Sequence, residues 1–253
     1  AQRLMGITQN HAADAYVVVI QIGAILAVMG LYWSRIKAMI LGILGRHAAG
    51  LRLAINIIVA FLPAAVVGLL FNDFIETNLF GLWPITAAWF VGGAAILATE
   101  VWRKRRKKLL MNVDPPVQGL ELEDLTWKLA LIIGIAQCSA MWPGTSRSLV
   151  TIVAGVLVGL RLVAAVEFSF LLGVLTLCAA SGYKIVTGGG AMFEHYGMQD
   201  MILGLLAAGV SAAIAVKWFV AYLNRHGLSI FGYYRIALAV LVAILILTQI
   251  VAP

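Results

Sequence analysis

The sequence has 253 residues, of which 62% are hydrophobic and only 11% are charged. A soluble domain is about half apolar and about a quarter charged, so this composition excludes an ordinary soluble protein and indicates a membrane protein. The formal net charge of +7 comes from basic residues in short segments between apolar runs, a pattern typical of membrane topology and not of nucleic-acid binding.

Apolar runs define the predicted elements, because a helix needs about 20 apolar residues to cross a bilayer. Six runs predict transmembrane helices, at 14–33, 52–71, 84–102, 162–183, 200–222 and 232–251. A seventh apolar region, 129–160, is interrupted by the polar turn 143–148. Its halves, near 129–141 and 148–160, are each too short to span, which predicts a re-entrant helix pair.

Lysine and arginine counts predict the orientation. The segments 34–52 and 103–128 are rich in basic residues, whereas 72–83 has Asp73 and Glu76 and no basic residue. We therefore expect the first two segments in the cytoplasm and the third outside. The re-entrant pair would then enter and leave the membrane from the cytoplasmic side.

Comparison of the chain with itself at an offset of 150 indicates an internal repeat. This offset lays the span 52–71 over 202–221 and the span 84–102 over 234–252. The two sets begin on opposite sides of the membrane, which predicts an inverted-topology repeat, an arrangement found in many transporter folds.

The repeat predicts the organisation of the chain as one membrane domain, 1–253. Repeat one is 1–110, repeat two is 129–253, and 103–128 is a cytoplasmic linker between them. The partner of the re-entrant pair would fall mostly before Ala1, so we expect repeat one to lack its first hairpin in this sequence.

The turn 143–148 carries the predicted chemistry. Pro143 ends the first half-helix, and Gly144 permits a tight turn. The hydroxyl groups of Thr145, Ser146 and Ser148 are candidate caps for the second half-helix. The N-terminus of that half-helix points free N–H groups into the membrane interior, which favours binding of an anion such as phosphate.

Arg147 adds a fixed positive charge with bidentate geometry for phosphate oxygens. An arginine at membrane depth is expensive, so it predicts a functional site. The alternative is an ion pair with a carboxylate such as Glu167 that joins two helices. Gln137 has two interpretations of equal weight, as a polar ligand of the site or as a hydrogen-bonding residue between helices.

Cys138 and Cys178 lie in apolar segments 40 positions apart. Two isolated cysteines make neither a disulfide framework nor a zinc site, and no protein metal ligand is predicted from these residues.

The turn and its surroundings resemble the bacitracin-resistance type of undecaprenyl-diphosphate phosphatase. That family has a Pro-Gly-x-Ser-Arg-Ser-x-x-Thr motif, matched by Pro143, Gly144, Ser146, Arg147, Ser148 and Thr151. Further similar stretches are Gln21 to Val28, Pro63-Ala64 with Gly68-Leu69, Gly92-Gly93 to Glu100, Glu167 to Leu172, and Tyr234-Arg235. The resemblance covers essentially the whole chain.

The resemblance implies a multi-pass enzyme of the bacterial cytoplasmic membrane that hydrolyses undecaprenyl diphosphate and recycles the lipid carrier for peptidoglycan synthesis. It implies Arg147, Ser146 and Thr151 as catalytic residues. Gly144, Thr145, Ser148 and Gln137 would bind the isoprenyl diphosphate. A flippase or an anion transporter of the inverted-repeat class is the alternative, and a homodimer is compatible with the sequence.

The sequence departs from the family pattern in two places. Leu149 follows the Ser-Arg-Ser triplet where the family has Gly. The family's first motif, a glutamate pair followed by Ser-Ser-Thr-Gly-His, is absent, and the repeat places it before Ala1. We therefore expect the acid–base groups upstream, together with the ligands of a divalent cation, Mg²⁺ or Ca²⁺.

Overall fold

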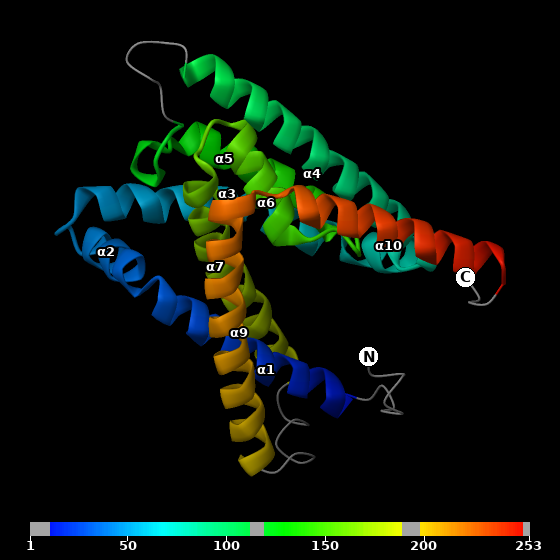
Figure 1. Cartoon of the computed structure of the whole chain (residues 1–253). Helices are drawn as coiled ribbons and strands as arrows, with labels where there is room; N and C mark the ends of the chain where they lie inside the picture. Colours follow the sequence, from blue (N-terminus) through cyan, green and yellow to red (C-terminus); the bar gives the residue numbers. More distant parts are fainter. Residues whose placement is uncertain (1–10, 112–118, 189–197, 250–253) are drawn as a thin grey trace. The chain divides into compact units, whose positions relative to one another are not determined.

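The computed structural model describes residues 11–111, 119–188 and 198–249, and every regular element in these ranges is helical. The helices are α1 (His11–Leu31), α2 (Trp33–Ile43), α3 (Ala48–Leu79), α4 (Leu82–Met111), η2 (Leu122–Asp124), α5 (Trp127–Cys138), η3 (Ser139–Met141), α6 (Arg147–Leu157), α7 (Leu162–Gly188), α9 (Met198–His226) and α10 (Ser229–Leu247) (Figure 1).

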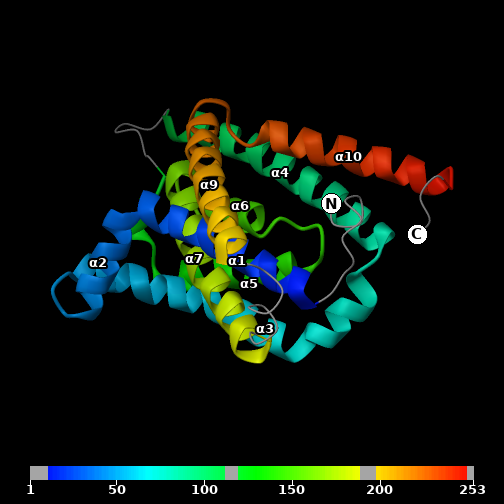
Figure 2. The same cartoon turned by 90° about the horizontal axis from the view of Figure 1, so that it is seen from below.

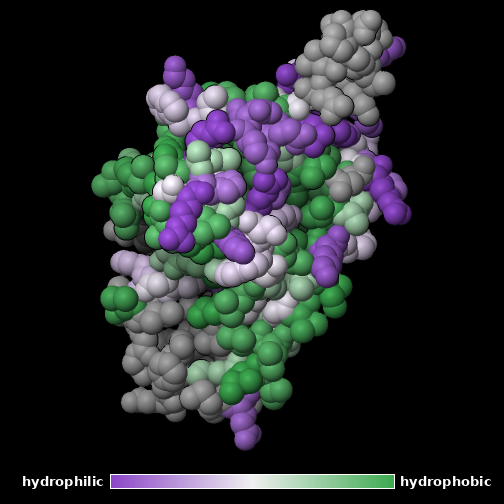
Figure 3. Space-filling model, turned by 90° about the vertical axis from the view of Figure 1, so that its left-hand side faces the viewer, coloured by the Kyte–Doolittle hydropathy of each residue, from purple (hydrophilic) through white to green (hydrophobic). Residues whose placement is uncertain are grey.

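Among the described helices, five are long and apolar enough to cross a membrane: Ala48–Phe71, Leu82–Arg106, Leu162–Tyr183, Met201–Leu223 and Ser229–Leu247. A bent pair, Ile20–Leu31 with Trp33–Ile43, qualifies as a sixth when it is taken as one span. Hydrophobic residues cover much of the face shown in Figure 3, where hydrophilic residues lie mainly in the upper half of the view. The prediction of an all-α membrane protein with about six spans is confirmed.

The segment 34–52 is not the continuous loop that its basic residues suggested. Helix α2 occupies its first part and turns by 83° from α1. The apolar residues from Ala38 to Ile43 continue a helical pattern in which Arg35 and Lys37 are isolated charges. Helix α4 likewise runs on to Met111, so the basic run 103–108 is helical.

The chain divides into two compact units, residues 1–38 with 170–219 and residues 39–169 with 220–253. In the first unit, α1 and α9 approach closely because both have glycine at the contact. A Cβ added to Gly23 would collide with the Leu205 carbonyl and lie 3.2 Å from the Gly209 nitrogen. Phe170 stacks on Tyr32 and meets Phe219 edge-on, with centroid distances of 6.0 and 6.2 Å.

The second unit contains two close helix pairs. Helices α4 and α10 lie side by side in both ribbon views (Figures 1 and 2). A Cβ added to Gly93 would lie 2.9 Å from the Gly232 carbonyl oxygen, so this pair meets backbone to backbone. Helix α5 packs on α3 in the same way, because Gly134 lies directly against the backbone of Ala60.

A buried carboxylate fixes the start of α10 against α4. Glu100 is 2% exposed and accepts hydrogen bonds from Arg103 at 2.6 and 3.1 Å. The backbone N–H of Leu228 also reaches the Glu100 carboxylate, at 3.5 Å. Because these contacts hold α10 at its N-terminus, they also set the position of the side chains further along α10.

The two ends of the broken apolar region meet. Leu120, before α5, pairs with Leu160, after α6, in an isolated parallel bridge. The backbone hydrogen bonds Leu120 N–H to Gly159 O and Arg161 N–H to Leu120 O are both 2.9 Å long. Glu121 and Arg161 form an ion pair beside them. Adjacent ends are what a re-entrant hairpin requires, and α5 and α6 are the two predicted short helices.

Candidate phosphate site

The turn between α5 and α6 is built as its sequence predicts. Helix α5 tightens into η3 at Ser139–Met141 and stops before Pro143. Gly144 has φ +89°, a left-handed conformation that glycine adopts without penalty. The Thr145 N–H donates to the Trp142 carbonyl at 3.0 Å and closes the turn.

Helix α6 begins at Arg147, with Ser146 as its N-cap residue. The predicted side-chain cap is absent, because Ser146 makes no capping hydrogen bond and its Oγ lies 3.3 Å from Ser148 Oγ instead. The first intrahelical bond at this end joins Val150 N–H to Ser146 O at 3.0 Å. An N-terminus without a side-chain cap leaves its first N–H groups to an external acceptor, and anions suit that position best.

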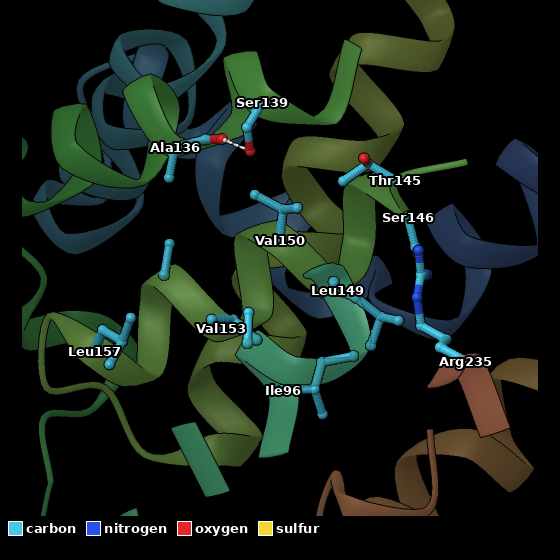
Figure 4. Close-up of a pocket in the computed structure, with 13 residues that line it drawn as sticks. Ile96, Ala136, Ser139, Thr145, Ser146, Leu149, Val150, Val153, Leu157 and Arg235 are labelled. Atoms are coloured by element: carbon cyan, nitrogen blue, oxygen red, sulfur yellow. Dashed lines mark hydrogen bonds between the residues drawn. The ribbon is translucent and has the colours of Figure 1, made fainter. Parts of the chain in front are cut away.

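A pocket of about 210 Å³ opens beside this helix end. Thr145, Ser146 and Arg235 line one end of it, and Ile96, Val153 and Leu157 are among its apolar lining residues. Figure 4 shows the Arg235 side chain reaching toward the Thr145–Ser146 segment, with Leu157 far from it. Most of the pocket lining is therefore apolar, and Thr145, Ser146 and Arg235 lie together at one end (Figure 4).

The seven predicted site residues divide into two groups. Thr145 and Ser146 line the pocket. The others do not line it: Gly144 and Arg147 lie in or next to the turn, Ser148 is in the first turn of α6, Thr151 is one turn further on, and Gln137 is on α5.

Thr151 has a hydroxyl group that is used inside the protein. The residue is fully buried, and its Oγ1 lies 2.6 Å from Ser169 Oγ and 3.1 Å from the carbonyl oxygens of Arg147 and Ser148. Ser169 Oγ also lies 3.2 Å from the Ser148 carbonyl oxygen. The pair joins α6 to α7, and phosphate donation by Thr151 stays a prediction.

Replacing Thr151 by Val should lower the free energy of unfolding by about 1–2 kcal/mol, because the shape is kept while the Ser169 hydroxyl loses a buried partner. Thermal unfolding in detergent measures the change. Ser169→Ala and the double variant complete a double-mutant cycle. Additive effects of the two substitutions would contradict the pairing.

Gln137 is 2% exposed, and neither end of its side-chain amide has a hydrogen-bond partner among the described residues. Helices α3 and α5 pack on each other, yet the predicted hydrogen bond between helices is not formed by this residue. A buried amide without hydrogen bonds lowers the stability of the folded protein. The predicted role of Gln137 as a ligand of the site stays a prediction.

The described residues do not supply a metal site. Within 11–111, 119–188 and 198–249, no three His, Cys, Asp or Glu side chains come together around a metal-sized space. The donor set present at the turn consists of hydroxyl groups, backbone N–H groups and arginine, which fits an anion and does not fit a divalent cation.

From the sequence, Arg147 is a predicted site residue, whereas Arg235 appears only in Tyr234-Arg235, a stretch similar to the family, and has no predicted role. Arg235 lies inside the span Ser229–Leu247, and the high energy of a charge in hydrocarbon could have identified it too. Ser169 gave no comparable signal, because serine is common in membrane helices and its partner Thr151 lies 18 positions earlier.

The fold and the turn together define a multi-pass membrane protein in which a helix without a side-chain cap begins beside a pocket. Residues 1–241 match the family described as bacitracin resistance protein BacA. The chain belongs to this family, whose members are multi-pass proteins of the bacterial cytoplasmic membrane.

Similar proteins include an undecaprenyl-diphosphatase of Sorangium cellulosum, 44% identical over 92% of this chain and 74% of that protein. An undecaprenyl-diphosphatase 2 of Rhodospirillum rubrum is 38% identical over 96% of this chain and 84% of that protein. An undecaprenyl-diphosphatase of Maridesulfovibrio salexigens is 39% identical over 94% of this chain and 86% of that protein.

Proposed function

We propose that this protein hydrolyses undecaprenyl diphosphate to undecaprenyl phosphate and inorganic phosphate, and thereby recycles the lipid carrier for cell-wall synthesis. The observation that carries the proposal is the uncapped N-terminus of α6, next to a mostly apolar pocket that has Thr145, Ser146 and Arg235 at one end. A phosphate at the helix end and an isoprenyl chain along the apolar lining would suit this arrangement. The names of the three relatives support the same activity.

In this proposal, Arg147 neutralises the diphosphate, and Ser146 and the first N–H groups of α6 donate hydrogen bonds to its terminal phosphate. Phosphoryl transfer depends mainly on alignment and on stabilising negative charge. Water forms the new P–O bond as the bond to the bridging oxygen breaks, and undecaprenyl phosphate leaves. The lining residues Ile96, Val153 and Leu157 would contact the first isoprene units.

The acid–base groups and the ligands of a divalent cation are proposed to lie outside the described residues. EDTA should then reduce phosphate release to background, and Mg²⁺ or Ca²⁺ should restore it. The readout is free phosphate from the purified protein. Full activity after exhaustive chelation would contradict the metal proposal without affecting the phosphate site.

Phosphate release separates the enzyme from the alternative of a lipid-carrier flippase or an anion transporter. Purified protein in detergent, supplied with undecaprenyl diphosphate, should release phosphate over many turnovers. The Arg147→Ala variant, purified in the same way, is the control. A carrier would release none.

A homodimer is also proposed, and light scattering of the detergent-solubilised protein tests it.

A further inference from the structure

Arg235 is the second arginine beside the phosphate turn. It lies on α10, and its Nη2 group donates a hydrogen bond of 2.6 Å to the carbonyl of Gly144, 91 positions earlier in the chain. It also lines the pocket together with Thr145 and Ser146. One side chain therefore touches both the backbone of the turn and the space beside it (Figure 4).

The surroundings of Arg235 are shaped to hold its side chain. A Cβ added to Gly92 on α4 would lie 3.3 Å from Nη2, 3.4 Å from Nε and 3.5 Å from Cζ, so the guanidinium lies directly on this glycine. The close contact of Gly93 with Gly232 brings α10 within reach, and the bond from Leu228 to Glu100 fixes its start. The backbones of α4 and α10 therefore fix the position of the Arg235 side chain.

Arg235 holds the carbonyl group of Gly144, which is the one residue of the turn 143–148 with positive φ. On its other side, Gly144 lies against α4, where an added Cβ would be 3.0 Å from the Ile85 carbonyl oxygen and 3.2 Å from Trp89 Nε1. The hydrogen bond from Arg235 fixes the orientation of the peptide between Gly144 and Thr145. That peptide leads within two residues into the first turn of α6.

We infer that Arg235 is a positioning residue that holds the Gly144 carbonyl and so aims the N-terminus of α6 and Arg147 at the phosphate. The inference rests on the proposed function for its kinetic consequences. Arg235 acts through the turn: it keeps the donors of the first turn of α6 at the geometry that the transition state requires. A misplacement of about 1 Å in such a group can lower the rate about 10²-fold.

Kinetics separate positioning from ground-state binding. Arg235→Met removes the donor and the charge and keeps much of the side-chain length. We expect kcat to fall about 10²-fold, with KM within about threefold of wild type. Arg235→Lys, which can still donate to the Gly144 carbonyl, should recover part of the loss. A raised KM with unchanged kcat, or wild-type kinetics for Arg235→Met, would overturn the inference.

A second variant disturbs Arg235 without removing it. Gly92→Val adds carbon atoms where the guanidinium lies, so kcat should fall in the same direction as in Arg235→Met. Gly182→Val is the matched control, because a Cβ there meets nothing within 4 Å, and it should keep wild-type kcat. If Arg235→Met does not fold, Arg235→Lys and Gly92→Val decide; wild-type kcat in both would overturn the inference.

Hydrogen exchange of the ligand-free protein gives a readout that does not depend on activity. Backbone amides from Thr145 to Leu149 should exchange faster in Arg235→Met and Gly92→Val than in wild type, and Gly182→Val should not change them. Absence of phosphate release from wild type would defeat the proposed function while this comparison still tests Arg235. Unchanged exchange in both variants would refute the positioning role.

Discussion

Arg147→Ala should lower kcat/KM for phosphate release on the order of 10²–10³-fold, because it removes the cation that opposes the charge of the diphosphate in the transition state. The measurement is steady-state phosphate release from undecaprenyl diphosphate in detergent. Arg147 is the first residue of α6, so its loss changes the donors at the helix end and not the transmembrane spans.

Arg147→Lys is the informative control. Lysine keeps the charge but lacks the planar fork that binds two phosphate oxygens together. We expect activity between those of wild type and Arg147→Ala. If Arg147→Ala kept nearly normal phosphate release, the assignment of this turn as the phosphate site would be wrong, and the interpretation as a structural ion pair would gain support.

Gly144→Ala is the second substitution with a large expected effect. Its φ of +89° is unfavourable for alanine, and the new Cβ would lie 3.0 Å from both Ile85 Cγ2 and the Ile85 carbonyl oxygen. The turn must shift to relieve these contacts. We expect a loss of about 1–3 kcal/mol in the free energy of unfolding and a fall in kcat of about 10²-fold.

Gly45→Ala separates backbone strain from damage to the site. Gly45 also has positive φ, +75°, but a Cβ there meets nothing within 4 Å. This variant should lose about 1 kcal/mol of stability, from its conformation alone, and keep wild-type phosphate release. Equal losses of activity in Gly45→Ala and Gly144→Ala would show that the effect at Gly144 is not specific to the turn.

The local features of the hairpin could be predicted from the sequence because they depend on neighbouring residues. Pro143 cannot continue a helix, Gly144 accepts a left-handed conformation, and the apolar halves are too short to span. Helix α5 ends at Cys138 and α6 begins at Arg147, with the break between them, close to the expected bounds. Span lengths were predictable for the same reason, since hydropathy is a property of consecutive residues.

The contacts that fix the turn could not be predicted in this way. The bond from Arg235 to Gly144 joins residues 91 positions apart, and the Thr151–Ser169 pair joins two helices. Both depend on how helices pack, which is decided by glycine contacts such as Gly93 with Gly232. The 83° bend between α1 and α2 lies two residues after Gly30. Apart from this glycine, the local sequence does not explain the bend.

The inverted repeat, the orientation in the membrane and the divalent cation remain predictions. The offset of 150 pairs α3 with α9 and α4 with α10, which are four of the five long apolar helices in the described ranges. Accessibility of single cysteines introduced at Arg52 and Asn78 to a membrane-impermeant reagent would test the predicted orientation directly.

The most direct test of the central claim is an experimental structure with a methylene-bridged diphosphonate analogue of undecaprenyl diphosphate, which cannot be hydrolysed at the bridge. The terminal phosphonate should lie within hydrogen-bonding distance of the first N–H groups of α6 and of the Arg147 guanidinium. The first isoprene units should follow Ile96, Val153 and Leu157. A head group bound elsewhere, for example at the basic run 103–108, with the turn empty, would contradict the account.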